Sequence, residues 1–452
     1  MIFLIKKKDQ TITMKKYFSI FSAALLCICI CALLLVGYQW FSPQPVAEDT
    51  APPDVLVPIT PSPYYSEKAI TRGLDALTTA DQRAVYLSIV RRIASVTDEP
   101  TGNNYTNNEG YFMQRLYTPR LGAQELAMVI DCVREDYPEA FWLTGNCRHG
   151  TNESGQYFIQ PISFLSKTEI AAAIVSFNQS VSMALASIPQ NLSEFDRELF
   201  VHDWLITHCE YDTKGYDTDK NDLFTGSAYG AFVGGQTVCE GYARGFQLLL
   251  KMVGIDSALI TGSSSSPLSV AGRAHIWNAV KIDGQWYQAD VTWNDSRGME
   301  NSHDYLNLTT QKMSDDHHFD PPFSLSSSHS SSASEDYFSR FNRALPECTA
   351  TEMNYYNQKS VAIDTKSQLS LDKVSQELVK AYQRGGQNIS VIFTAEETQE
   401  SCRSWLTQFA FFQSARDANL MLGQKVFHED EVYFMHSETF ENVLIFQLPL
   451  ER

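Results

Sequence analysis

The 452-residue sequence lacks the cysteine spacings that would hold a structural metal or build a disulfide framework. Its nine cysteines include no Cys-x-x-Cys pair and no cluster with histidine, so the pattern predicts no metal ligand set. Cys132 and Cys147 could form one bridge, and no motif indicates a cofactor. Three cysteines lie in an apolar run near the N-terminus, and the others are Cys132, Cys147, Cys209, Cys239, Cys348 and Cys402.

Positive charge is also scarce. The formal net charge is −18, and residues 42–452 hold 30 basic and 52 acidic residues, a net charge of −22. Such a surface repels nucleic acid and other anionic polymers. We therefore expect no nucleic-acid partner. A neutral or cationic protein or peptide segment suits this charge better, although solubility alone also explains it.

The N-terminus does contain one long hydrophobic run. Five lysines within residues 6–16 precede an apolar stretch over 17–41, which is long enough to span a bilayer. We expect a cytoplasmic basic tail over 1–16 and an uncleaved signal anchor, a single transmembrane helix, over 17–41. This arrangement predicts a protein of the cell membrane whose later domains lie outside the cytoplasm.

Proline is concentrated in one segment. Seven of the 17 prolines fall within 42–63, which predicts an extended linker that separates the anchor from the folded domains. The remaining length suits two or three domains. We expect an N-terminal α/β domain over 64–190, a catalytic core over 191–345 and a small C-terminal α/β domain over 346–452.

The core contains a cysteine at the predicted start of a helix. After Cys239, apolar residues recur at helical spacing up to Val253, and Gly254 is a typical helix stop. A thiol at a helix N-terminus lies next to unpaired backbone N–H groups and the positive end of the helix dipole, which both favour the thiolate. The spacing therefore predicts that Cys239 is a nucleophile.

A predicted hairpin follows this helix. The stretch 275–293 is rich in aromatic and β-branched residues on both sides of Asp283-Gly284, which predicts two strands joined by a two-residue turn. That turn would place His275 opposite Thr292 and diagonal to Asp290 on the same sheet face. Diagonal neighbours lie within reach of an imidazole and a carboxylate. The register predicts a His275–Asp290 pair.

Cysteine, histidine and aspartate together form the arrangement of a thiol acyl-transfer site. The segments VCEGYARGF, AHIWNAVKIDGQWYQADVTWND and YLNLTTQKMSDDHH carry these residues, and they resemble the transglutaminase-like superfamily in its bacterial cell-surface branch. The resemblance covers about residues 195–320. It implies an α+β, papain-like core, in which a nucleophile helix packs on an antiparallel sheet, and a triad at Cys239, His275 and Asp290.

These residues leave the reaction open. A thioester on Cys239 could pass to water, which gives deamidation or peptide hydrolysis, or to an amine, which gives a cross-link. One rival is a cysteine peptidase that acts on surface or cell-wall peptides. A rival of another class is a non-catalytic adhesion or scaffold module of the cell surface with a vestigial triad. The sequence indicates neither the substrate nor the oligomeric state.

Several other polar residues have weaker claims. Gln236 and Tyr211 could donate a hydrogen bond to an oxyanion, although papain-like enzymes place their glutamine six residues before the cysteine. His202 and His208 lie six residues apart, which does not place them on one helix face and favours structural roles. A His/Asp cluster near the end of the core could recruit a cation, but similar sequences recur in the family without ligating metal; it comprises His303, Asp304, Asp315, Asp316, His317 and His318.

Overall fold

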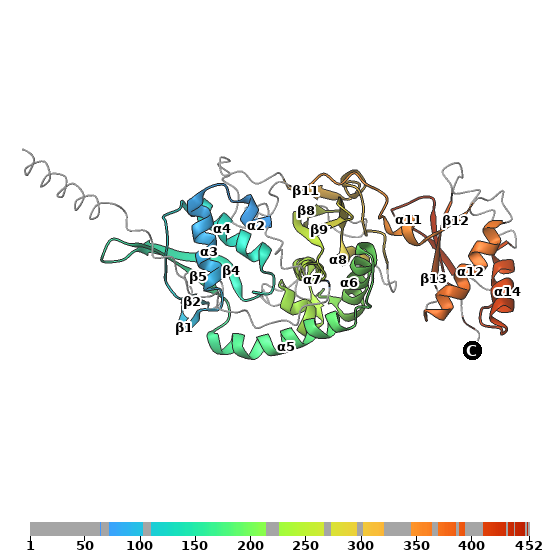
Figure 1. Ribbon diagram of the computed structural model, residues 1–452, viewed down its shortest axis with the longest axis horizontal. Coiled ribbons are helices and arrows are strands. Elements are labelled where there is room, and N and C mark those ends of the chain that lie inside the picture. The colour runs from blue at the N-terminus through green and yellow to red at the C-terminus, as the bar shows by residue number, and fades with distance from the viewer. Residues whose placement is uncertain are drawn as a thin grey trace, which may run out of the picture. The chain divides into compact units, whose positions relative to one another are not determined.

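The computed structural model places its described helices and strands within Pro53–Arg452 (Figure 1). The described residues are Tyr64, 72–102, 110–213, 226–265, 273–295, 302–320, 345–363, 369–385, 388–393, 410–430, 433–437, 439–447 and Leu450. The predicted basic tail, anchor and linker, 1–63, lie outside these residues, so they stay predictions. The domain boundaries at 190 and 345 also stay predictions.

The first part of the described chain combines short helices with an antiparallel sheet. The sheet order is β1-β2-β5-β3, and β4 also pairs with β5. Helix α3 begins with a complete capping box at Thr79 and Gln82, which satisfies two of its free N–H groups. The elements are α2 (Arg72–Ala76), α3 (Ala80–Arg91), β1 (Val96–Pro100), β2 (Tyr111–Met113), β3 (Leu116–Tyr117), α4 (Ala123–Asp136), β4 (Leu143–Thr151) and β5 (Tyr157–Ser163).

Two longer helices lead into the core: α5 (Lys167–Ala186) and α6 (Glu194–His208). Among the described helices, α5 alone is long and apolar enough to cross a membrane. However, Phe177 and Val181 on α5 are fully buried in the hydrophobic core of the folded unit. A core helix passes the same test of length and composition, so α5 is weak evidence for a span.

The central sheet has the order β10-β9-β8-β11, and all of its pairs are antiparallel. Its strands are β8 (Asp256–Ser264), β9 (Arg273–Ile282), β10 (Gln285–Ala289) and β11 (His317–Phe319). Helix α7 (Cys239–Met252) packs against β8 and β9 (Figure 1). This arrangement confirms the predicted α+β core, with a nucleophile helix on an antiparallel sheet.

The hairpin has the predicted register but a shorter second strand. Gln285 pairs with Ile282, and Asp283 and Gly284 have φ values of 48° and 83°, as a two-residue turn requires. The second strand was expected to continue to residue 293. Instead, β10 ends at Ala289 and the chain turns into the short helix α8 (Val291–Asp295). His275 therefore pairs not with Thr292 but with Gly262 of β8.

Short elements complete the core around these layers. The parallel pair β6 (Glu210–Tyr211) and β7 (Gln236–Thr237) joins the end of α6 to the start of α7. Gly245 allows α7 to approach its neighbours closely, because a Cβ there would lie 3.0 Å from the Ala231 side chain. A π-helical turn (Gly230–Gly234), α9 (Thr310–Met313) and α11 (Tyr355–Lys359) are the other elements of this part.

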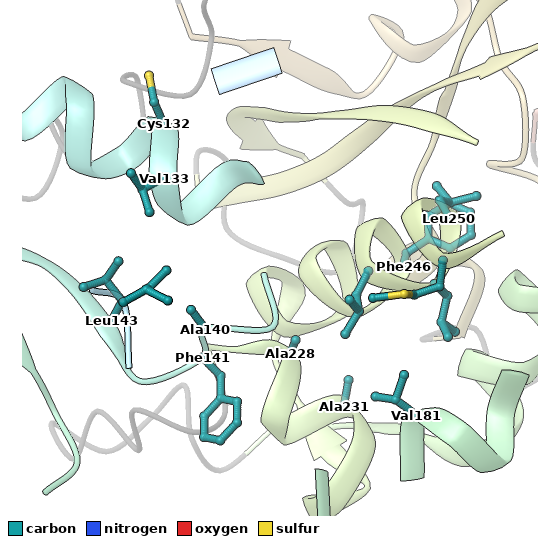
Figure 2. Packing of buried hydrophobic residues seen from close by; sticks show 14 of the residues in the cluster. Cys132, Val133, Ala140, Phe141, Leu143, Val181, Ala228, Ala231, Phe246 and Leu250 are labelled. Carbon is teal, nitrogen blue, oxygen red and sulfur yellow. The ribbon is translucent and has the colours of Figure 1, made fainter. Parts of the chain in front are cut away.

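One hydrophobic cluster extends through the first part and the core. Figure 2 shows Phe141 and Leu143 from the first part, Val181 from α5, and Phe246 and Leu250 from α7 within this cluster. The aromatic-rich sequence 136–143 contributes buried Trp142, whose indole N–H donates to the Ile93 carbonyl at 3.0 Å. The cluster therefore includes residues from both sides of residue 190.

The last part of the chain forms a mixed sheet of order β12-β13-β15-β14. Its apolar centre is separate from the larger cluster. Strand β14 (Tyr433–His436) pairs antiparallel with β15. The other elements are β12 (Val361–Ile363), α12 (Leu369–Gln383), β13 (Asn388–Phe393), α14 (Ala410–Leu422) and β15 (Val443–Gln447).

Candidate active site

Cys239 is the first residue of α7, as its spacing predicted. Its side chain is 9% exposed and packs with Ala243, Leu259 and Ile276. Helix starts leave backbone N–H groups without intrahelical partners, and the N-cap residue Val238 supplies no side-chain hydrogen bond to them. The positive end of the helix therefore acts on the thiol.

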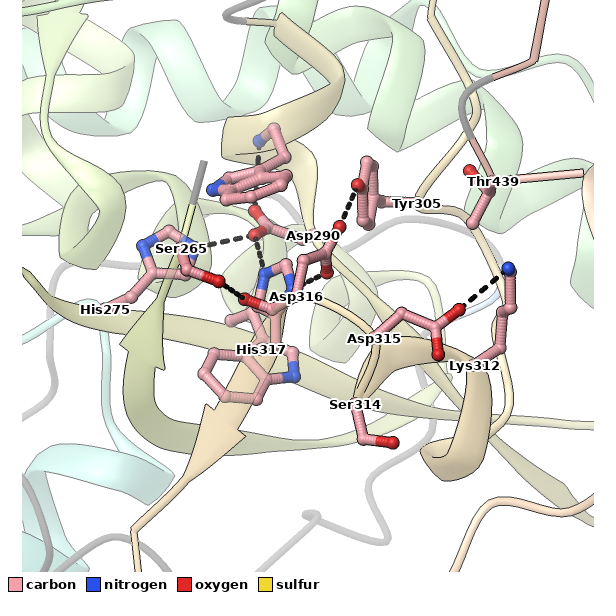
Figure 3. Close-up of polar contacts among 12 residues, drawn as sticks. Ser265, His275, Asp290, Tyr305, Lys312, Ser314, Asp315, Asp316, His317 and Thr439 are labelled. Carbon is pink, nitrogen blue, oxygen red and sulfur yellow. Dashed lines mark hydrogen bonds and ion pairs between the residues drawn. The ribbon is translucent and has the colours of Figure 1, made fainter. Parts of the chain in front are cut away.

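His275 and Asp290 meet beside this helix start. His275 comes from β9, and Asp290 follows the last residue of β10. His275 Nε2 lies 2.6 Å from Asp290 Oδ2, and both side chains are buried (Figure 3). The predicted His–Asp pair therefore forms. It does so although the strand ends one residue earlier, because the Asp290 N–H donates to the Tyr305 carbonyl at 2.9 Å and fixes the turn.

Asp290 is also the N-cap of α8. Its Oδ1 accepts a hydrogen bond from the Trp293 N–H at 3.1 Å, which leaves Oδ2 for the imidazole. Burial alone would raise the pKa of Asp290, but the charge and hydrogen bond of His275, together with His317, hold it below its ordinary value. The carboxylate is therefore ionised and held by both of its oxygens.

The thiol of Cys239 is a second hydrogen-bond partner of the His275 imidazole. Burial alone would lower the pKa of His275. The charge and hydrogen bond of Asp290, followed by the hydrogen bond and charge of Cys239, outweigh burial and raise this pKa well above its ordinary value. Asp290 binds the ring at Nε2. Sulfur, imidazole and carboxylate thus lie in sequence, as a proton-transfer chain requires.

His317 is a residue of this site that the sequence analysis placed in a structural cluster. It lies on β11, which pairs with β8, and its side chain is fully buried. His317 Nε2 lies 3.0 Å from Asp290 Oδ2, the oxygen that also binds His275. Its Nδ1 lies 2.6 Å from Asp316 Oδ1 (Figure 3). The sequence shows that Asp316 and His317 are neighbours, but it does not show that His317 contacts Asp290.

Aromatic rings enclose the two histidines. The His317 ring centroid lies 4.6 Å from Trp293, 4.9 Å from Trp277 and 5.6 Å from Tyr305. The Trp277 ring also lies nearly parallel to His275, at 5.8 Å and 20°. These rings restrict rotation of the imidazoles and exclude water from the carboxylate between them.

A second His–Asp–His cluster contacts Asn294 of α8, four residues after Asp290. Asp203 Oδ1 lies 2.9 Å from His202 Nδ1 and 2.7 Å from His303 Nε2. Asn294 of α8 donates its amide to His202 Nε2 at 2.8 Å, and the Asn294 oxygen accepts from the Tyr305 N–H at 2.9 Å. The structural role expected for His202 agrees with these contacts. His208 on the same helix points away, onto Trp204.

Both clusters bring potential metal ligands within 4.8 Å of one another. In the second cluster, the Asn294 amide fixes a neutral His202 that donates from Nδ1, so this nitrogen has no lone pair for a metal. Burial also lowers the pKa of His202. In the first cluster, nitrogens lie 2.6 and 3.0 Å from one oxygen. Ligands of one zinc ion would lie roughly 3.3 Å apart, so these contacts are hydrogen bonds.

The two oxyanion candidates lie on the short strands before α7. Gln236 is exposed, and its strand runs parallel to that of Tyr211. Their role stays a prediction. The Cys132–Cys147 bridge considered from the sequence was wrong: Cys147 is a free thiol that donates to the Arg148 carbonyl at 3.3 Å.

Comparison with known proteins agrees with this geometry. The sequence model of the transglutaminase-like superfamily matches residues 184–291, which contain all three triad positions. Kyphoscoliosis peptidase from Mus musculus is 23% identical over 139 residues, which cover 29% of this chain and 21% of that protein. The chain thus spans about a fifth of the length of the curated relatives it matches.

Solved structures of two classes are similar to parts of the chain. A crystal structure of a TGase shares 14% identity and covers 42% of this chain and 52% of its own, with a TM-score of 0.24. A candidate cysteine protease from Cytophaga hutchinsonii shares 15% identity over 32% of this chain and 61% of its own, with a TM-score of 0.22.

The core therefore has a transglutaminase-like, papain-like α+β fold. More narrowly, the chain contains a transglutaminase-like superfamily domain with homology to kyphoscoliosis peptidase.

Proposed function

We propose that this protein is a thiol-dependent acyl-transfer enzyme that acts on protein or peptide amides. The observation that supports this most is the ordered contact of the Cys239 thiol with His275 and of His275 Nε2 with Asp290 at 2.6 Å. Members of the transglutaminase-like superfamily are typically enzymes. Their chemistry needs a nucleophile, a proton carrier and an orienting carboxylate, and the site contains all three.

The first half of the reaction follows from these positions. The Cys239 thiolate attacks the amide carbonyl, and the backbone N–H at the start of α7 donates to the oxyanion that forms. His275 then transfers its proton to the departing nitrogen, the C–N bond breaks, and a thioester and a free amine result. Asp290 orients the imidazole through Nε2 throughout.

The second half decides between hydrolysis and transfer. His275 removes a proton from water, which releases an acid, or from a primary amine, which creates a new amide; either attack returns the proton to the thiol of Cys239. The name of the similar kyphoscoliosis peptidase favours hydrolysis as the second candidate, a cysteine peptidase of surface or cell-wall peptides.

One experiment separates the alternatives. The full chain is incubated with a fluorescent primary amine and a glutamine-rich protein, and in parallel with a peptide library. Amine incorporation that disappears in Cys239→Ala supports transfer, and cleavage that disappears in the same variant supports hydrolysis. If neither product forms and Cys239 reacts with iodoacetamide at the same rate in His275→Ala, the acyl-transfer proposal is wrong. A non-catalytic adhesion or scaffold module would then be favoured.

We also place this activity outside the cytoplasm, at the cell membrane. The basis is the apolar run 17–41 behind five lysines, which predicts one span with the N-terminus in the cytoplasm. Protease treatment of intact cells should remove an epitope at the C-terminus but spare one at the N-terminus. Protection of both epitopes would contradict this topology.

A further inference from the structure

The geometry points to His317 as a positioning residue of the Cys239 site: it stays doubly protonated between Asp290 and Asp316 and shares the Asp290 carboxylate with His275. This inference deepens the proposed function and rests on it. The triad chemistry of Cys239, His275 and Asp290 does not need a second histidine.

Each ring nitrogen of His317 faces a carboxylate oxygen. Nε2 lies 3.0 Å from Asp290 Oδ2 and Nδ1 lies 2.6 Å from Asp316 Oδ1. An ionised carboxylate only accepts hydrogen bonds, so each nitrogen must donate a proton for both contacts to be favourable. A ring with two N–H groups is an imidazolium. The ring is fully buried, which makes an unfavourable lone-pair contact with either carboxylate costly.

Both carboxylates are suited to remain ionised. Asp290 accepts from His275, His317 and the Trp293 N–H. Asp316 also accepts from the Tyr305 hydroxyl on its other oxygen, as Figure 3 shows. Among the described groups, those that face His317 are therefore the two carboxylates, His275 at 5.4 Å between ring centroids, and three uncharged aromatic rings.

The consequence is an alternating series of charges. Thiolate, His275 imidazolium, Asp290 carboxylate, His317 imidazolium and Asp316 carboxylate follow one another. His317 holds the Asp290 carboxylate in one orientation, and it also offsets part of its negative charge. The His275 imidazolium is therefore stabilised less than it would be by an unshared carboxylate. At the same time, the added positive charge favours the Cys239 thiolate.

Removing the His317 charge should therefore shift the reactivity of Cys239 along the pH axis. Without it, the thiolate forms at higher pH and His275 keeps its proton to higher pH. The acidic limb of the pH profile marks the formation of the Cys239 thiolate, and the basic limb marks the loss of the His275 proton. Both limbs should move to higher pH, by about one pH unit. The basic limb should move further, because His317 contacts Asp290 and not the thiol. A merely structural role would lower the amount of folded protein without moving the limbs.

Two variants remove the positive charge of His317, and they change the hydrogen bonds around it in different ways. His317→Gln retains an N–H donor near the Nε2 position but carries no charge. Asp316→Asn leaves the ring in place and lets the new amide donate to Nδ1, so His317 keeps only the Nε2 proton. Asp315→Asn is the matched control, because Asp315 is exposed and pairs with Lys312 at 2.8 Å rather than with the site.

The measurement is the rate of Cys239 alkylation by iodoacetamide from pH 4 to pH 10 in the full chain, quantified on the Cys239 peptide. We expect upward shifts in His317→Gln and Asp316→Asn, and none in Asp315→Asn. If both variants have the same pH profile as the wild type and His275→Ala still alters the profile, the inference is wrong and the proposed function stands. A profile that His275→Ala does not change would overturn both.

A direct measurement covers the case in which His317→Gln does not fold. In wild-type protein with ¹⁵N-labelled histidine, both His317 ring nitrogens should have the chemical shifts of protonated nitrogens at pH 7. In Asp316→Asn, one of them should change to the shift of an unprotonated nitrogen. An unprotonated nitrogen in the wild-type ring would contradict the inference.

Discussion

The core contains two carboxylates that are each shared by two histidines, and only one of these clusters meets a thiol. Asp290 is almost completely buried, whereas the Asp203 side chain is 36% exposed. Helix α8 separates them: Asp290 caps its start, and Asn294 near its end binds His202. Histidine and aspartate alone therefore do not define a reactive site. The two clusters differ in the thiol that lies beside one of them and in the assignment of protons.

The largest difference between the clusters should be in activity. We expect Asp290→Asn to lower kcat by about 10³- to 10⁴-fold, because an amide no longer stabilises the His275 imidazolium or enforces its tautomer. Asp203→Asn should change kcat by less than about threefold, since the hydrogen bonds of the Asp203 carboxylate go to His202 and His303 and not to Cys239 or His275. Amide hydrolysis or amine incorporation measures both. Equal losses would remove the distinction between the clusters.

The second difference should be in stability. His202→Ala removes a fully buried ring with two hydrogen bonds and leaves the Asn294 amide without its acceptor. We expect a loss of about 2–4 kcal/mol in the free energy of unfolding, measured in urea. His208→Ala is the control on the same helix. It removes an exposed ring stacked on Trp204 and should cost about 0.5–1 kcal/mol.

The third effect is a pH dependence of stability, and it concerns Glu198, one helical turn before His202. Burial raises the pKa of Glu198 to about 8 from 4.5, although the Asn307 hydrogen bond opposes this. The neutral carboxyl therefore contributes stability that is complete below pH 4.5 and is lost as the pH rises to about 8.

Glu198→Gln tests this pH dependence because glutamine stays neutral. Between pH 5 and 8, the unfolding free energy of the wild type should fall relative to that of the variant by up to about 1.4 kcal/mol per pH unit. Urea unfolding at several pH values measures the difference. Glu194→Gln, at a partly exposed position on α6, should follow the wild type. A constant difference between wild type and Glu198→Gln would show that Glu198 ionises normally.

The sequence was sufficient for the parts of the site that depend on local rules. The spacing after Cys239 predicted α7, and the Asp283-Gly284 turn predicted the hairpin register that brings His275 near Asp290. The end of β10 was not predictable in this way. The residues after Asp290 favour a strand by composition, but the Asp290 side chain caps a helix there instead.

The contact of His317 with Asp290 could not be predicted from local rules, for a different reason. It reaches Asp290 because β11 pairs with β8, more than 50 residues earlier in the chain, and no turn fixes that register. The sequence showed neighbouring aspartates and histidines, and these are common at exposed positions. Only the pairing of His317 with Ser264 brings the ring inside and toward Asp290.

The contacts at the first turn of α7 bear on how this protein can be truncated. Glu240, next to the nucleophile, binds Arg244 at 2.9 Å and lies 3.6 Å from Arg134 of α4. Arg134 precedes the matched segment 184–291, and His317 follows it. A fragment excised at those limits would retain the three reactive groups and lose supports on both flanks. If such a fragment were inactive, the loss of these supporting contacts would explain it, and the result would not test the chemistry of the site.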